Sequence, residues 1–264
     1  MNRTLARVRT PFESAFAQAG NIFALFIDVL RKTFRRPFQW REFIEQSWFI
    51  ASVSILPSAL VAIPFGAVVA LQTGSLIKQL GAESFTGATS VLATVQQAAP
   101  VVTALIIAGA AGSAVAADLG SRTIREEIDA MEVLGVDPVQ RLVVPRVLGM
   151  MLVALLLNGL VSVVGIAGGY FFNVLLQGGT PGAYLASFSA LAQLPDLWIG
   201  EIKALVFGLI AGVIAAYKGL HPTGGPKGVG DAVNQSVVIT FLVLFFVNLI
   251  LTLVYLQVVP AKGQ

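Results

Sequence analysis

The stretch from Gly109 to Pro145 reads GAAGSAVAADLGSRTIREEIDAMEVLGVDPVQRLVVP, and it decides the fold. The charged residues of the chain crowd together here, and an apolar run long enough to cross a bilayer lies on each side. A charged segment between two membrane spans is either a solvated turn or a surface that binds a partner. The choice between these two interpretations determines the function.

The composition indicates an integral membrane protein. Of the 264 residues, 56% are hydrophobic and only 12% are charged, and the mean hydropathy is +0.82. Soluble domains of this size do not show that balance. There is no cysteine, which excludes disulfides and thiol-based metal or redox sites. The net charge of +3 comes from basic residues that flank apolar runs, so it indicates membrane topology and no nucleic-acid partner.

Periodicity predicts an all-α fold with one amphipathic helix and five transmembrane helices. Over residues 12–36, aromatic and aliphatic side chains recur at helical spacing and the end is basic, which is typical of a helix in the membrane interface. The alternative for this helix is the core of a small soluble domain. Pro57 and Pro64 predict a bent or locally unwound first span. The spans are predicted at residues 46–77, 89–117, 139–176, 197–217 and 232–259.

The distribution of lysine and arginine predicts the orientation in the membrane. Five spans place the two ends of the chain on opposite sides. Fourteen of the 17 basic residues fall in the N-terminal segment, the central charged stretch and the 218–230 loop. The positive-inside rule therefore predicts a cytoplasmic N-terminus and an outer C-terminus, and the protein is expected in the plasma (inner) membrane.

Within the charged stretch, residues 122–134 are predicted to form a short helix. Thr123 and Glu126 fit a capping box, and Gly135 fits the position just after a helix. An aliphatic stripe and charged faces together suit a groove on a soluble partner, which favours docking over a solvated turn. The stripe consists of Ile124, Ile128 and Met131, and the charged residues are Arg122, Arg125, Glu126, Glu127, Asp129 and Glu132.

No pattern in the chain indicates catalysis or a cofactor site. The glycine-rich loop at 218–230 lacks the GxxxxGK[ST] motif, so no nucleotide site is expected in this chain. His221 is the single histidine and has no second ligand of its kind. Asp118, Glu201 and Lys203 are ionisable residues at the membrane margins. They either reach the interface or line an internal cavity.

The run ADLGSRTIREEIDAMEVLGVDPVQRLVVPR, residues 117–146, resembles the signature of the MlaE/YrbE permease family. These are the membrane subunits of ABC transporters that move lipids together with MCE proteins. IKALVFGLIAG at 202–212 and GVG at 228–230 are also similar to that family, so the resemblance covers the chain from its first helix onward. Asp118, where many members have Glu, and the run EEIDAMEVLG are more similar to the YrbE subunits of mycobacterial-type Mce systems.

The resemblance implies a permease subunit with no enzymatic activity of its own. The helix at 122–134 would be the coupling helix that docks into a dimer of cytoplasmic ABC ATPases, and these partner chains would bind ATP and magnesium. A second YrbE/MlaE-type permease, typically a paralogue, would complete the membrane dimer. An MCE-protein assembly would lie on the outer face.

An apolar pocket at the dimer interface is expected to hold the lipid, with a fatty-acyl or sterol-like substrate. The first and fifth spans would line this pocket, and the candidate contacts are Phe65, Val68 and Leu71. The alternative function is a proton-coupled secondary carrier of apolar substrates that uses the three margin residues. Co-purification of an ATPase separates these two hypotheses.

Overall fold

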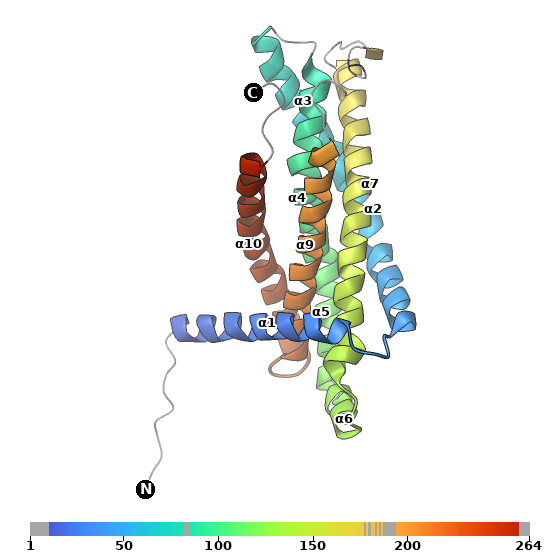
Figure 1. The fold of residues 1–264 in the computed structure, drawn as a ribbon, viewed down its shortest axis with the longest axis vertical. Coiled ribbons are helices and arrows are strands. Elements are labelled where there is room, and N and C mark those ends of the chain that lie inside the picture. The colour runs from blue at the N-terminus through green and yellow to red at the C-terminus, as the bar shows by residue number, and fades with distance from the viewer. Residues whose placement is uncertain are drawn as a thin grey trace.

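The computed structural model describes residues 11–81, 85–176, 178, 181–182, 184, 186 and 194–258. Every regular element that these residues form is a helix. Five spans stand side by side as a bundle, and α1 (Pro11–Thr33) lies across one end of it (Figure 1). All five are long and apolar enough to cross a membrane, so the predicted all-α class with five spans is confirmed.

The spans contain short π-helical turns as well as α-helix. The second span has two such turns, the third begins with one, and the short helix α6 extends beyond the bundle between these two spans (Figure 1). In chain order the elements are α2 (Trp40–Gln79), α3 (Thr86–Ala93), η2 (Thr94–Ala98), α4 (Ala99–Ile106), η3 (Ile107–Ala111), α5 (Gly112–Ile124), α6 (Glu127–Val133), η4 (Val139–Val143), α7 (Val144–Leu176), α9 (Leu194–Leu220) and α10 (Pro226–Val258). Val259, the last residue of the predicted fifth span, lies outside the described residues.

The first span is one uninterrupted helix of 40 residues, although it contains Pro57 and Pro64. Each proline removes one backbone donor, but helices that pack alongside compensate for such a loss inside a membrane protein. α2 packs along α7. The predicted local unwinding is therefore absent.

Glycines let the central helices approach each other closely. A Cβ atom built on Gly66 of α2 would lie 2.2 Å from the carbonyl oxygen of Gly165 of α7. A Cβ atom built on Gly208 of α9 would lie 2.7 Å from the carbonyl oxygen of Met150, also of α7. Because no real Cβ atom tolerates such distances, α7 is held between α2 and α9 by backbone contacts that only glycine permits.

The largest core cluster lies toward the end of the bundle that carries α1 and α6. It joins side chains of α1, α2, α5, α6, α7 and α9, so α6 is anchored to the bundle. Its fully buried members include Val29, Ile50, Val115, Leu119, Val143 and Met150.

Candidate functional site at the charged end of the bundle

α6 is a separate helix, and a sharp turn divides it from α5. Glu126 forms this turn in the left-handed conformation, with φ 61°. The predicted capping box is wrong because α5 continues past its first member: Thr123 Oγ1 donates to the Leu119 carbonyl at 2.9 Å, one turn earlier in the same helix. The helix predicted over 122–134 is thus confined to Glu127–Val133.

The end of α6 follows the prediction. Gly135 has φ 75°, a conformation that favours glycine. Its N–H donates to the Glu132 carbonyl at 2.9 Å, and the N–H of Val136 donates to the Met131 carbonyl at 2.9 Å. These two bonds form a Schellman motif, so Gly135 occupies the predicted position after the helix.

The aliphatic stripe of α6 faces the protein itself. Ile128 is buried in the core cluster, and Met131 packs against that cluster. Ile124, the third residue of the stripe, lies at the end of α5 and is 37% accessible, and the most exposed apolar side chains are Val133 and Leu134, which are 88% and 78% accessible at the tip of α6. Of the predicted stripe, only Ile124 is therefore open to a partner, and docking remains a prediction.

A chain of ion pairs connects α6 with three spans. Arg146 of α7 lies 2.7 Å from Asp118 of α5 and 3.5 Å from Glu42 of α2. Asp118 also lies 3.2 Å from Arg122, whose guanidinium is 3.6 Å from Glu127 of α6. Displacement of α6 would therefore act on α5, α7 and α2 through charged contacts.

Arg146 is the centre of this network, and its side chain is completely buried. A buried guanidinium is tolerated only when carboxylates and carbonyls compensate it, and loss of one partner leaves a charge without compensation. In the sequence Arg146 resembles any basic residue that flanks a span. Its role was missed because no sequence pattern indicates that it faces Asp118.

The other charged residues predicted for docking surround α6. Arg125 pairs with Glu127 at 3.1 Å, and Glu126, Asp129 and Glu132 are exposed. Among the described residues, no group of three His, Asp or Glu side chains could hold a metal ion. These residues are charged and mostly exposed along α6, and Glu132 directly precedes the exposed Val133 and Leu134.

Helix α1 is tied to the loop that leads from α6 into the third span. Lys32 lies 2.6 Å from Asp137, which also accepts hydrogen bonds from the N–H groups of Val139 and Gln140 at 3.0 and 3.4 Å. Burial raises the pKa of Asp137, but the hydrogen bond and charge of Lys32 and the two backbone donors together leave that pKa below its usual value. α1 and α6 are thereby linked across the charged end.

A second polar cluster lies inside the other half of the bundle. Lys203 is 1% exposed, and its Nζ donates to the Gln96 carbonyl and to Thr252 Oγ1, both at 2.9 Å. The Gln96 carbonyl is available because residue 100, four positions later, is a proline without an N–H. Lys203 thus contacts internal groups, and the alternative that it reaches the membrane interface is wrong.

The three ionisable residues predicted at the margins do not meet. Glu201 accepts a hydrogen bond from Asn158 Nδ2 at 3.1 Å, and its second oxygen is buried without a partner among the described residues. Asp118 belongs to the network at the charged end. A relay of protons through these three residues therefore has no continuous geometry.

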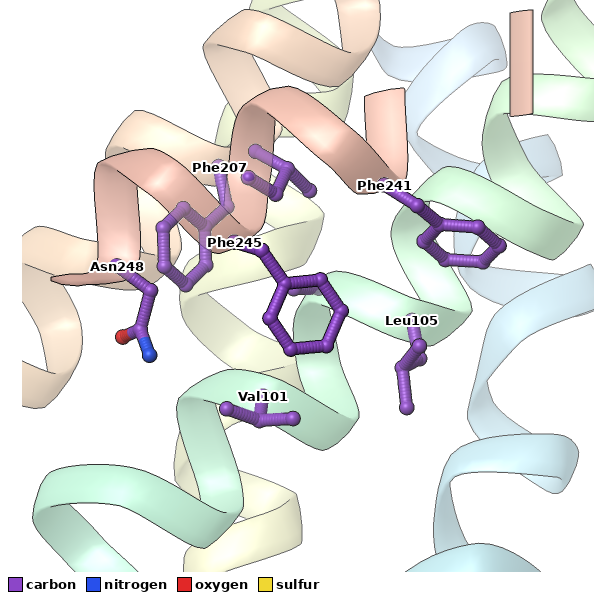
Figure 2. Close-up of a pocket in the computed structure, with 8 residues that line it drawn as sticks. Val101, Leu105, Phe207, Phe241, Phe245 and Asn248 are labelled. Atoms are coloured by element: carbon purple, nitrogen blue, oxygen red, sulfur yellow. The ribbon is translucent and has the colours of Figure 1, made fainter. Parts of the chain in front are cut away.

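An apolar pocket lies where α4, α9 and α10 meet, and Figure 2 shows the aromatic rings that surround it. A shallow groove of about 490 Å³ adjoins this pocket, and its lining includes Gln97 and Thr252. Thr252 also accepts the hydrogen bond from Lys203, so Lys203 lies directly behind the lining of the groove. Phe65, Val68 and Leu71 lie on α2, which packs on α7, and they remain predictions for lipid contacts. The pocket is lined by Val101, Ala104, Leu105, Phe207, Phe241, Leu244, Phe245 and Asn248.

Comparison with known proteins identifies the family. The family described as Permease MlaE matches residues 43–254. A probable ABC transporter permease protein of Synechocystis is 34% identical, over 92% of this chain and 90% of its own length. A probable ABC transporter permease protein of Rickettsia typhi is 32% identical, over 90% and 92%. The chloroplastic protein TRIGALACTOSYLDIACYLGLYCEROL 1 of Arabidopsis thaliana is 28% identical, over 87% and 65%. The chain belongs to the MlaE permease family and is a membrane-spanning permease subunit of an ABC transporter.

Proposed function

We propose that this permease moves lipid across the plasma membrane and that a separate ATPase dimer, docked on α6, drives it. The observation that carries the proposal is the form of α6. It presents an apolar tip at one end of the bundle and is joined by a chain of ion pairs to α5, α7 and α2.

The tip suits a groove on a soluble partner. Val133 and Leu134 are exposed although they are aliphatic, and exposed charged residues of α6, such as Asp129 and Glu132, precede them. Protein interfaces commonly combine an apolar centre with polar surroundings. The left-handed Glu126 and Gly135 fix the direction of α6 on both sides, so the helix can act as a rigid coupling element.

The ion-pair chain supports transmission from α6 into the membrane. Nucleotide-dependent closure of the ATPases would displace α6, and Glu127, Arg122 and Asp118 would carry this displacement to Arg146. Arg146 also contacts Glu42, so the first span would move with the third. Packed helices that shift as rigid bodies are a common switching mechanism.

The groove of about 490 Å³ beside the pocket supports an apolar substrate with a polar head, because the pocket between α4, α9 and α10 itself holds only about 20 Å³. Phe245, Phe246 and Leu249 line the groove together with Gln97 and Thr252, and the buried Lys203 lies behind Thr252. A fatty-acyl or sterol-like lipid has this chemistry. The Arabidopsis relative is named after a diacylglycerol lipid, which agrees with such a substrate.

We infer the arrangement of the partner proteins from the orientation of the chain in the membrane and from the exposed apolar side chains of α10. The basic residues at the α1 and α6 end support a cytoplasmic position for that end and for the N-terminus. A second permease, in the Mce systems a paralogue, covers apolar side chains of α10, of which Phe246 is 68% and Leu253 is 53% exposed. An MCE-protein assembly on the outer side exchanges lipid with the pair.

Purification in a mild detergent tests the proposal against a proton-coupled carrier. An ABC permease brings a nucleotide-binding subunit with it, and lipid movement in vesicles requires ATP. A carrier purifies without an ATPase, and a proton gradient is sufficient to drive it. Transport that continues without any nucleotide-binding subunit would refute the proposal.

A further inference from the structure

Three arginines at the connection between α1 and α2 face solvent without a carboxylate partner among the described residues. The last turn of α1 and the segment after it hold four basic residues, Arg31, Lys32, Arg35 and Arg36. Lys32 pairs with Asp137. The three arginines are exposed, and no described carboxylate lies within ion-pair distance of them. This arginine patch, Arg31, Arg35 and Arg36, therefore offers three guanidinium groups to an anionic partner.

Exposed aromatic side chains adjoin the arginine patch. Phe34 lies within it in sequence and is 87% exposed. Trp40, Ile44 and Trp48 follow at intervals of four residues, so they lie on one face of α2, and all three are exposed. The ring of Trp40 is held edge-on against Phe38, with the ring centroids 4.8 Å apart. Large exposed aromatic side chains beside cations are typical of the boundary between lipid tails and water.

The apolar part of the first span begins close to the patch. The charged residues at the start of α2 end at Glu45, and the next charged residue is Lys78. Leu56, two further intervals of four residues beyond Trp48, is also exposed and continues the same face along the span. α1 lies perpendicular to the spans at the level where α2 begins (Figure 1). The connection between α1 and α2 therefore has the position of a segment at the surface of the bilayer.

We propose that the arginine patch, together with Phe34 and Trp40, binds the phosphate groups of anionic membrane phospholipids. Guanidinium groups match phosphate oxygens in charge and geometry, and the two aromatic rings suit the first carbon atoms of the acyl chains. Phosphatidylglycerol carries an unbalanced phosphate charge, whereas the choline of phosphatidylcholine balances it, so the patch selects the anionic lipid. The proposal rests on the position of this connection at the membrane surface and does not depend on lipid transport.

Photochemical labelling with two lipids tests the site. The full chain, with the subunits that co-purify with it, is reconstituted into phosphatidylcholine nanodiscs that contain a small fraction of a probe lipid. The probe is either phosphatidylglycerol or phosphatidylcholine with a diazirine in the acyl chain next to the ester. Cross-linked peptides are mapped by mass spectrometry, and the ratio of labelling by the two probes is compared along the chain.

The ratio should favour phosphatidylglycerol at residues 34–48. Each basic residue near a membrane surface increases the affinity for anionic lipid about five-fold, so a preference of at least about ten-fold is expected there. At Trp198, which is exposed near the start of α9 at the opposite end of the bundle, the two probes should label equally.

Variants with matched charge separate this site from the general field of the protein. Arg35→Gln should lower the preference about five-fold, and the combined Arg31→Gln, Arg35→Gln and Arg36→Gln variant should abolish it. Lys227→Gln removes one charge at an exposed residue of α10 and should leave the preference unchanged. All these side chains are exposed, so each variant should elute like the wild type in size-exclusion chromatography.

Three results would overturn the proposal. Equal labelling of residues 34–48 by the two probes would mean contact with bulk lipid only. Equal losses of preference in Arg35→Gln and Lys227→Gln would mean a general attraction by the basic end of the protein. A preference that appears only after co-purifying subunits have been removed would mean that an acidic protein surface covers the arginines.

Discussion

Nη2 of Arg146 lies 2.7 Å from Oδ2 of Asp118, and no part of the arginine side chain is exposed. This pair joins α5 to α7 at the level where α6 leaves the bundle. Because Asp118 also holds Arg122, the same carboxylate serves the spans and the segment that leads to α6. The proposed docking helix α6 is therefore connected to the membrane helices by ion pairs as well as by apolar packing.

Asp118→Asn should destabilise the protein by about 2 kcal/mol. Removal of one partner from a buried pair costs about 3–5 kcal/mol, and the smaller figure reflects the partial exposure of Asp118 and the remaining contact of Arg146 with Glu42. Thermal unfolding in detergent measures the change. The matched control is Asp129→Asn at an exposed position, which should change stability by less than about 0.5 kcal/mol. Equal effects of the two substitutions would contradict the role of the buried pair.

Gly66→Ala should strongly reduce the yield of folded protein. The added Cβ would lie 2.2 Å from the Gly165 carbonyl oxygen, so α2 and α7 would have to move apart at a cost of at least about 1–3 kcal/mol. Gly20→Ala on α1 is the control, because nothing lies within 4 Å of its added Cβ and alanine favours helix. Fluorescence-detected size-exclusion chromatography compares the two, and a normal Gly66→Ala profile would refute the close contact.

Asp137→Asn should destabilise the protein at neutral pH, and the difference should disappear in acid. The pKa of Asp137 is lowered in the folded protein, so its ionised form contributes stability above the unfolded pKa of about 3.8. This contribution is lost as the pH falls through the lowered, folded pKa. Asparagine can still accept the hydrogen bonds from Val139 and Gln140, so the substitution isolates the ion pair with Lys32.

Thermal unfolding of wild type and Asp137→Asn from pH 7 down to pH 3 checks this prediction. The two melting temperatures should approach each other below about pH 4. A difference that stays constant over the whole range would show that the Lys32–Asp137 pair contributes nothing to stability.

Lys203→Met should weaken lipid binding and leave assembly with the ATPase unchanged. Methionine keeps most of the side-chain length but removes the cation that binds Thr252 at the groove, and loss of the charge-assisted hydrogen bond that orders this hydroxyl should lower the affinity for a lipid head group about ten-fold. Lipid that co-purifies with the complex is measured by mass spectrometry. Lys227→Met, at an exposed residue, is the control. Unchanged lipid content in Lys203→Met would exclude this cluster from the substrate site.

The architecture was largely predictable from the sequence because a bilayer imposes simple requirements. Predominantly apolar runs of sufficient length predicted all five spans, and Gly135 correctly indicated the end of α6. These features depend on composition or on a local conformation that only a few residue types adopt. The capping box was predicted wrongly because the same residues can form a different local structure. Thr123 donates to a carbonyl one turn earlier in α5, and Glu126 adopts the left-handed conformation of the turn.

The site was less predictable because it depends on which helix faces which. Arg146 and Asp118 are far apart in sequence, and only the packing of α5 against its neighbours buries their contact. Lys203 was expected near a membrane margin, but the carbonyl left free by Pro100 and the hydroxyl of Thr252 hold it inside the bundle. The helical stripe that includes Ile128 indicated an apolar face correctly but not its partner, which is the protein's own core.

The most direct test of the account is the amount of ATPase that co-purifies when the tip of α6 is changed. Val133→Asp combined with Leu134→Asp should reduce co-purified ATPase at least ten-fold, while the permease remains monodisperse because both side chains are exposed. The control Leu80→Asp, at a residue that is 78% exposed and follows the end of α2 outside the spans, should retain the ATPase. Wild-type amounts of ATPase on the α6 variant would contradict docking at the tip.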